Sequence, residues 1–180
     1  MRIIAGTARG RRLVSPDGQD VRPTSDRARE ATFNALHSAG AIEAATVLDL
    51  FAGSGALGLE ALSRGADHVI FVDSSPVALA AVRANLDLLG FTARATVVAG
   101  DAMADFPGRG SEYDLALLDP PYAFDRWPDL LRQLTARVIM VESDREIDVA
   151  PRWVAFRQKR YAGTVVTLAR AAATVDSEKS

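Results

Sequence analysis

Apolar runs alternate along the chain with segments that carry apolar residues at helical spacing. Five runs are short and nearly continuous, as in buried strands: TVLDLFA (46–52), HVIFVD (68–73), ARATVVAGD (93–101), YDLALLD (113–119) and RVIMVES (137–143). The segments between them predict helices: ALGLEALSRG (56–65), SPVALAAVRANLDLLG (75–90) and WPDLLRQLT (127–135). This alternation predicts an α/β fold, with parallel strands and helices on both faces of the sheet.

The beginning of the chain predicts a small β unit and then a helix. In residues 1–22, two short apolar segments flank the turn-prone TARG (7–10), as in a β-hairpin. The helix is predicted over residues 24–40, with Thr24 or Ser25 as its N-cap and a glycine at its end.

The end of the chain predicts antiparallel pairing. Residues 152–163 and 164–171 read as two strands that turn at Ala162 and Gly163, which makes seven strands in the main sheet. The chain then divides into an N-terminal extension (1–22), one α/β domain (23–170) and a flexible tail (171–180).

The composition fits one soluble domain without thiol chemistry. Of its 180 residues, 48% are hydrophobic and 24% are charged, which is ordinary for a globular protein. The chain has no cysteine, which excludes disulfides and zinc–thiolate sites, and no apolar run approaches the roughly 18 residues that cross a bilayer. Its two histidines, His37 and His68, stand far apart. We expect a cytoplasmic protein, with no membrane or metal partner.

The net charge of −2 conceals an asymmetry. Residues 1–30 hold seven arginines against four acids, a net charge of +3, which leaves −5 for the remainder. A basic end on an acidic body predicts contact with a polyanion at one place, and the guanidinium fork suits phosphate. The candidate contacts are Arg9, Arg11, Arg12 and Arg22.

A glycine-rich turn predicts a nucleoside cofactor. The stretch DLFAGSGALGLEAL (49–62) places Gly53, Gly55 and Gly58 between a strand and a helix, the setting in which such glycines allow a tight turn and close approach of a ligand. Asp73 ends the next strand, where a carboxylate can accept both ribose hydroxyls or cap the following helix.

Two cofactors fit the turn, NAD and S-adenosylmethionine. Asp49 lies in the first strand, two residues before Phe51, and a carboxylate there would disfavour a pyrophosphate and attract the α-ammonium of S-adenosylmethionine. Asp101, in GDAM (100–103), can accept from an adenine amine or cap a helix. These acids favour S-adenosylmethionine.

The quartet Asp119-Pro120-Pro121-Tyr122 follows the fourth strand. Prolines can simply end a strand, but that reading leaves the acid and the aromatic ring unexplained. In an open α/β sheet the carboxyl ends of the strands border the ligand crevice. There, the Asp119 carboxylate and the Pro120 carbonyl could accept from an exocyclic amine while Tyr122 stacks on its base. The quartet predicts an amine clamp for methyl transfer.

Six stretches together resemble one known family. They are MRIIAGTARGRRL (1–13), RPTSDRAREATFNAL (22–36), LDLFAGSGALGLEALSRGA (48–66), DPPY (119–122), VES (141–143) and RQKRYAGTVV (157–166). The sequence is similar, over nearly its whole length, to the RsmD family of bacterial 16S rRNA (guanine-N2) methyltransferases, which are class I S-adenosylmethionine-dependent enzymes.

The resemblance implies a Rossmann-like fold and methylation of the N2 amine of a specific guanosine in 16S rRNA. The RNA would be presented in the 30S subunit or an assembly intermediate. Separately, we expect the protein to be a monomer. The implied cofactor contacts are Asp49, Phe51, Gly53, Gly55, Asp73, Ser74, Asp101 and Ala102. Asp119, Pro120, Pro121 and Tyr122 would hold the target base. The implied border of the cofactor and RNA entrance is Arg22-Pro23-Thr24 with Arg29 and Glu30.

Three other functions remain open at this point. An adenine-N6 DNA methyltransferase would use the same quartet, although the chain has no separate target-recognition domain. The glycines alone also permit an NAD(P)-linked oxidoreductase. A non-catalytic ribosome-assembly factor would use the fold as an RNA platform.

Overall fold

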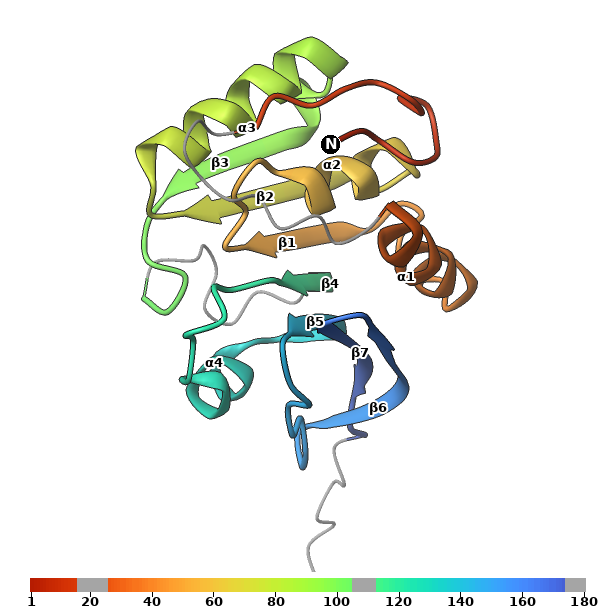
Figure 1. The fold of residues 1–180 in the computed structure, drawn as a ribbon, viewed down its shortest axis with the longest axis vertical. Helices are drawn as coiled ribbons and strands as arrows, with labels where there is room; N and C mark the ends of the chain where they lie inside the picture. The colour runs from red at the N-terminus through yellow and green to blue at the C-terminus, as the bar shows by residue number, and fades with distance from the viewer. Residues whose placement is uncertain (16–25, 105–112, 174–180) are drawn as a thin grey trace, which may run out of the picture.

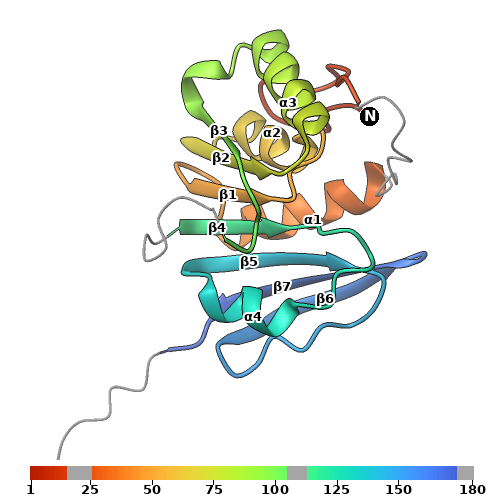
Figure 2. The same cartoon turned by 90° about the vertical axis from the view of Figure 1, so that its left-hand side faces the viewer.

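A seven-stranded sheet forms the centre of the molecule (Figures 1 and 2). The computed structural model describes residues 1–15, 26–104 and 113–173. The strands are β1 (Thr46–Leu50), β2 (His68–Asp73), β3 (Ala95–Ala99), β4 (Tyr113–Leu118), β5 (Ala136–Ser143), β6 (Trp153–Tyr161) and β7 (Thr164–Ala171). The helices are α1 (Asp26–Ser38), α2 (Ala56–Ser63), α3 (Pro76–Leu89), the short 3₁₀ helix η1 (Thr92–Arg94) and α4 (Trp127–Gln133).

The strand order is β3-β2-β1-β4-β5-β7-β6. The first five strands are parallel, and β7 pairs antiparallel with both β5 and β6. The predicted α/β fold and its antiparallel C-terminal hairpin are confirmed. The second strand of the hairpin lies inside the sheet and the first at its edge, because β7 is largely apolar and buried whereas β6 is charged and exposed.

Helices cover both faces of the sheet, as predicted (Figure 2). Phe33 of α1, Leu59 of α2 and Val82 of α3 belong to one hydrophobic cluster. Leu130 of α4 belongs to the cluster on the opposite face. Among the described residues, no helix is both long and apolar enough to span a bilayer.

The third helix shows both predicted end signals. The Ser75 hydroxyl accepts a hydrogen bond from the Ala78 amide at 3.3 Å, Pro76 occupies the first turn, and Gly90 ends the helix with φ 73°. The N-cap predicted for α1, Thr24 or Ser25, lies outside the described residues.

The N-terminal β unit is shorter than the hairpin that its sequence predicts. In residues 1–15 the pairing is one antiparallel bridge between Arg2 and Arg12. The Ile3 amide still donates to the Arg11 carbonyl at 2.9 Å, but the amides of Ile4, Ala5 and Val14 donate to side chains of α2 and α3.

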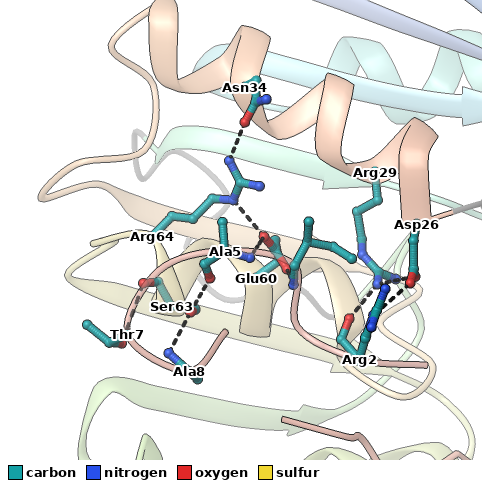
Figure 3. Close-up of polar contacts among 11 residues, drawn as sticks. Arg2, Ala5, Thr7, Ala8, Asp26, Arg29, Asn34, Glu60, Ser63 and Arg64 are labelled. Carbon is teal, nitrogen blue, oxygen red and sulfur yellow. Dashed lines mark hydrogen bonds and ion pairs between the residues drawn. The ribbon is translucent and has the colours of Figure 1, made fainter. Parts of the chain in front are cut away.

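The buried carboxylate of Glu60 holds the start of the chain against α2 (Figure 3). It accepts hydrogen bonds from the Ile4 amide at 2.8 Å and the Ala5 amide at 3.1 Å, and it pairs with Arg64 at 2.6 Å. One turn further on, the Ser63 hydroxyl accepts from the Ala8 amide at 3.0 Å. The N-terminal segment is therefore bonded along its length to α2.

A second anchor joins the same segment to the glycine-rich turn. The buried Asn85 side chain on α3 accepts from the Val14 amide at 2.7 Å and donates to the Val14 carbonyl at 2.9 Å. It also donates to the Ser54 carbonyl at 3.0 Å. One carboxamide thus fixes the N-terminal segment, α3 and the turn after β1.

Gly6 marks the closest approach of this segment to α2. A Cβ atom at Gly6 would lie 1.8 Å from the Ser63 carbonyl oxygen, and the backbone there has φ +83°. Gly10 has nearly the same backbone conformation, φ +81°, but nothing lies within 4 Å of a Cβ built there.

Replacing Gly6 by alanine should therefore cost more free energy of unfolding than replacing Gly10. Both variants carry the strain of a left-handed backbone, about 1 kcal/mol, and only Gly6→Ala adds a backbone clash, worth roughly 1–3 kcal/mol more. Urea unfolding measures both losses. Equal losses would show that the close approach contributes nothing to stability.

Candidate active site

The predicted site residues meet at one edge of the sheet, where the parallel strands end. The turn of residues 51–55 follows β1, Asp73 ends β2, and Asp119 follows β4. Because β1 pairs with both β2 and β4, these three features are neighbours in space. The carboxyl edge of a parallel sheet is where α/β proteins bind ligands.

The turn after β1 has a left-handed backbone conformation that hydrogen bonds maintain. Phe51, Gly53 and Gly55 all have positive φ, at 61°, 55° and 79°. The Gly53 amide donates to the Asp73 carboxylate at 2.8 Å, and the Gly55 amide donates to the Ala52 carbonyl at 2.7 Å. Positive φ is uncommon for an aromatic residue, so the surrounding bonds keep Phe51 in this conformation.

The three glycines of the motif, two in the turn and Gly58 in α2, differ in the space that a side chain would have. A Cβ at Gly58 would lie 2.4 Å from Phe71 Cε1 and 2.8 Å from Val69 Cγ1, so this glycine lets α2 pack on β2. A Cβ at Gly55 would be tight, 3.2 Å from the nearest atom. At Gly53 the nearest atom would be 4.0 Å away. Gly53 therefore borders open space, into which a ligand can approach the backbone.

Asp73 supports the turn and still faces its open side. Its carboxylate accepts from the Gly53 amide and from the Ser75 amide, both at 2.8 Å, and the side chain is half-buried. Each carboxylate oxygen has further acceptor capacity. Ser74, beside it, is exposed. The predicted ribose contact is compatible with this arrangement and stays a prediction.

Asp49 lies beneath the turn. It is 1% exposed, and its carboxyl group accepts from the Gly58 amide at 2.9 Å. Burial raises the pKa of Asp49 to about 8, against the lowering effect of the Gly58 hydrogen bond. At neutral pH the group is therefore largely protonated. Its negative charge is a weaker reason to prefer S-adenosylmethionine over NAD than the sequence suggested.

After β3, the GDAM stretch forms a turn. The Asp101 carboxylate accepts from the Met103 amide at 2.8 Å while the residue itself is exposed. Ala102 and Met103 are buried in the same cluster as α4. Asp101 therefore caps this turn, and its exposed carboxylate is compatible with the predicted adenine contact, which stays a prediction.

The quartet after β4 is held by β7 and by its own turn. The Tyr122 hydroxyl lies 3.2 Å from the Thr164 hydroxyl, at the start of β7. The Pro121 carbonyl accepts from the Phe124 amide at 2.8 Å. Pro120 is buried, whereas Asp119 and Tyr122 are half-buried. The clamp residues thus sit on a braced turn at the ligand edge, and their predicted contacts with a base stay a prediction.

Sequence reasoning missed an aromatic link between the two halves of this site. The Phe124 ring packs edge-on against Phe51, with centroids 5.3 Å apart, and against Trp127, 5.1 Å apart. The Phe124 carbonyl accepts from Arg145 at 3.1 Å. An aromatic residue two positions after the quartet was the available signal. This ring ties the clamp turn to the glycine turn.

Two arginine side chains near the N-terminus, Arg29 and Arg11, already bond to other parts of the protein, which makes them less available for binding RNA than the sequence suggests. Arg29 is 3% exposed and donates to the Arg2 carbonyl at 2.5 Å and to Asp26 at 3.1 Å. The Arg29 guanidinium is therefore engaged inside the protein, and its place at the border of the cofactor and RNA entrance stays a prediction. Arg11 is exposed and donates to the Leu88 carbonyl at 2.8 Å.

The structure describes some of the other predicted RNA contacts and leaves others outside its described residues. Arg9 and Arg12 are exposed. Arg22 lies outside the described residues, as do Pro23 and Thr24 of the predicted entrance. Contact of these arginines with RNA stays a prediction.

A family model described as "Conserved hypothetical protein 95" matches residues 1–170. The chain belongs to this family. It is 37% identical over 159 residues to the putative rRNA methyltransferase YlbH of Bacillus subtilis, covering 83% of this chain and 85% of that protein. It is 43% identical over 122 residues to ribosomal RNA small subunit methyltransferase D of Escherichia coli, covering 68% of this chain and 60% of that protein. The resemblance to the RsmD family is confirmed.

Solved structures share the fold of this RsmD-family chain. The putative methyltransferase yhhF from Escherichia coli superposes with a TM-score of 0.83 at 35% identity, covering 95% of this chain and 97% of that one. A magnesium protoporphyrin IX methyltransferase from Synechocystis, solved with bound SAM, superposes with a TM-score of 0.64 at 16% identity, over 81% of this chain and 79% of that one. The Rossmann-like class I methyltransferase fold is confirmed.

Replacing Gly58 by alanine should destabilise the protein although alanine is the better helix former. Alanine gains about 1 kcal/mol in a helix interior, but the overlap with Phe71 and Val69 costs up to about 3 kcal/mol, so we expect a net loss. Gly163→Ala, where nothing lies within 4 Å of the added Cβ, should change the free energy of unfolding by less than about 0.5 kcal/mol. A stabilised Gly58→Ala variant would contradict the close packing of α2.

Asp49 should make the protein less stable as the pH rises. Its pKa is about 8 when folded and about 4 when unfolded, so between these values the folded state holds the extra proton. The free energy of unfolding should fall through this window by up to about 1.4 kcal/mol per pH unit. Asp49→Asn keeps an acceptor for the Gly58 amide and should remove this slope. Urea unfolding from pH 5 to 8 gives the difference between the two proteins, and a constant difference would contradict a protonated Asp49.

Proposed function

We propose that this chain is an S-adenosylmethionine-dependent methyltransferase that modifies the exocyclic N2 amine of a guanosine in small-subunit rRNA. The proposal rests mainly on one observation: the glycine turn and the Asp119–Tyr122 quartet lie side by side at one edge of the sheet. The glycine turn and the Asp119–Tyr122 quartet follow neighbouring strands, and Phe124 packs between them and contacts Phe51. The names of the rRNA methyltransferase relatives support the substrate class.

The residues of the glycine turn fit a nucleoside cofactor. Gly53 leaves open space beside the backbone, and Asp73 would accept from the ribose hydroxyls. Asp101 would accept from the adenine amine. Asp49 would act indirectly, by holding the first turn of α2 through Gly58. Bound here, S-adenosylmethionine supplies an electrophilic methyl group on a sulfonium.

The quartet would orient the amine for attack on that methyl group. The guanine N2 lone pair is delocalised into its ring, so the amine is a weak nucleophile. Hydrogen bonds from its N–H groups to the Asp119 carboxylate and the Pro120 carbonyl would fix its direction. Tyr122 would stack on the base, and its hydroxyl is already placed by Thr164. The rate gain then comes mainly from positioning nucleophile and methyl in line.

Methyl transfer is tested with labelled cofactor on three substrates. Methyl-labelled S-adenosylmethionine is incubated separately with naked 16S rRNA, 30S subunits and duplex DNA, all from cells that lack the enzyme, and the nucleosides are analysed. We expect labelled N2-methylguanosine in the subunits. Labelled N6-methyladenine in DNA would contradict the substrate, and no label in any sample would contradict methyl transfer to these nucleic acids.

Replacing Asp119 by alanine should lower kcat at least about 100-fold, because the amine loses its carboxylate acceptor. Cofactor affinity, measured by calorimetry, should stay close to wild type, since Asp119 lies on the base side of the site. Asp67→Ala is the matched control, because Asp67 is exposed and lies before β2, at the opposite edge of the sheet. An Asp119→Ala enzyme with normal turnover would exclude the role proposed for the clamp.

A further inference from the structure

The C-terminal hairpin carries a concentration of positive charge. Residues 150–173 contain five arginines and lysines and no acid, in a protein whose net charge is −2. Eight of the nine residues of β6 are exposed or half-exposed, and β6 is an edge strand. Among the described residues, no carboxylate forms an ion pair with a cation of this hairpin.

Most of this charge lies on the same face of the sheet as α1. Arg157 is opposite Leu168, and Lys159 is opposite Val166. Leu168 and Val166 point into the core beneath α1 and α2, and residues opposite each other in an antiparallel pair share a face. We call Phe156, Arg157, Lys159, Tyr161 and Arg170 the edge strip.

Cations and aromatic rings are interleaved along the edge strip. Arg170 lies over the Phe156 ring at 5.0 Å, and Lys159 lies over the Tyr161 ring at 5.4 Å. Phe156 is 40% exposed, which is high for an aromatic side chain. A bulge between Ala155 and Arg157 places Phe156 beside Arg157.

A shallow groove runs between the edge strip and α1. It has a volume of about 570 Å³. Its walls are Ala31, Asn34, Ala35 and Ser38 of α1 with Ala39 just after it, facing Phe156, Arg157 and Arg170. The α1 wall has small and uncharged side chains, so the charge of the groove is positive. Such a groove suits an anionic chain with flat bases.

The other end of the edge strip reaches the clamp. Tyr161 pairs with Thr164 across the hairpin turn. The Thr164 hydroxyl lies 3.2 Å from the Tyr122 hydroxyl. The strip therefore leads from the groove beside α1 to the quartet after β4.

We propose that the edge strip binds a single-stranded segment of RNA next to the target nucleotide and leads it to the clamp. This inference rests on the proposed function for the identity of the RNA. Cations would contact phosphates while Phe156 offers a stacking face, the combination that binds single strands with little sequence preference. Because the neighbouring nucleotides are already held as a single strand, the target base could then enter the site without the opening of further base pairs.

The alternative role for the same charges is protection of the edge strand. Lysines, arginines and bulges on an edge strand prevent pairing with another chain. That role needs no aromatic stacking face and no groove. It also makes opposite predictions for RNA binding and for self-association, so one set of variants separates the two.

The test is salt-dependent RNA binding by the full chain. The probes are naked 16S rRNA and an unstructured oligouridine, which carries no target base. In the double variant Arg157→Ala with Lys159→Ala, the slope of log affinity against log salt should fall by about 1.4, the value for two lost single-strand phosphate contacts. The control is Arg83→Ala with Arg132→Ala, which removes the same charge from exposed positions on α3 and α4 and should leave the slope unchanged.

A second variant tests stacking separately from charge. Phe156→Ala should weaken oligouridine binding about tenfold with an unchanged salt slope. Because oligouridine contains no guanosine, these results do not depend on whether methyl transfer occurs. If the labelling experiment showed no methyl transfer, the RNA-binding results could still be interpreted.

Three outcomes would overturn the inference. Equal salt slopes for the strip and control variants would exclude phosphate contacts at the strip. Self-association of the strip variant with unchanged RNA binding, seen by size-exclusion chromatography, would mean that the charges only protect the edge. Lost methylation of 30S subunits with unchanged binding of both naked RNAs would assign the strip to a ribosomal protein.

Discussion

The buried carboxylate of Glu60 is the contact on which the helical face of the molecule depends. It satisfies two backbone amides at the start of the chain and pairs with Arg64, whose guanidinium also donates to Asn34 of α1 at 2.8 Å. A buried charge is tolerated only when such partners surround it. Because Glu60 sits on α2, which begins at the glycine turn, the same group connects the N-terminal segment to the ligand edge.

The ligand edge combines parts that are far apart in the sequence. The glycine turn, Asp73 and the quartet each follow a different strand, and the parallel register places them side by side. Rigidity comes from groups behind them: the Asp49 carboxyl group beneath α2, and Phe124 between the two loops. Positioning catalysis requires such support, since small displacements of the reacting groups lower the rate steeply.

In the part of the chain that the structure describes, local patterns were sufficient to predict the four α-helices and seven strands, because apolar periodicity marks each of them. The placement of the candidate site residues at the ligand edge could also be predicted, since a turn between a strand and a helix has a known place in this fold class; the roles of these residues stay predictions. Contacts and burial that depend on residues far apart in the sequence could not be predicted in this way. Glu60 reads as a polar position on a short helix, and only the folded chain reveals its partners. The protonation of Asp49 depends on complete burial, which no local pattern reports. Likewise, the position of β6 at the edge follows from competition with the more apolar β7 for the interior.

The docking of residues 1–15 has a consequence for biosynthesis. A ribosome makes this segment before it makes the side chains that satisfy its amides, Glu60, Ser63 and Asn85. Until then its backbone groups must stay bonded to water. Residues 1–15 are thus made before the elements that fix them, and their docking requires that α2 and α3 have already formed.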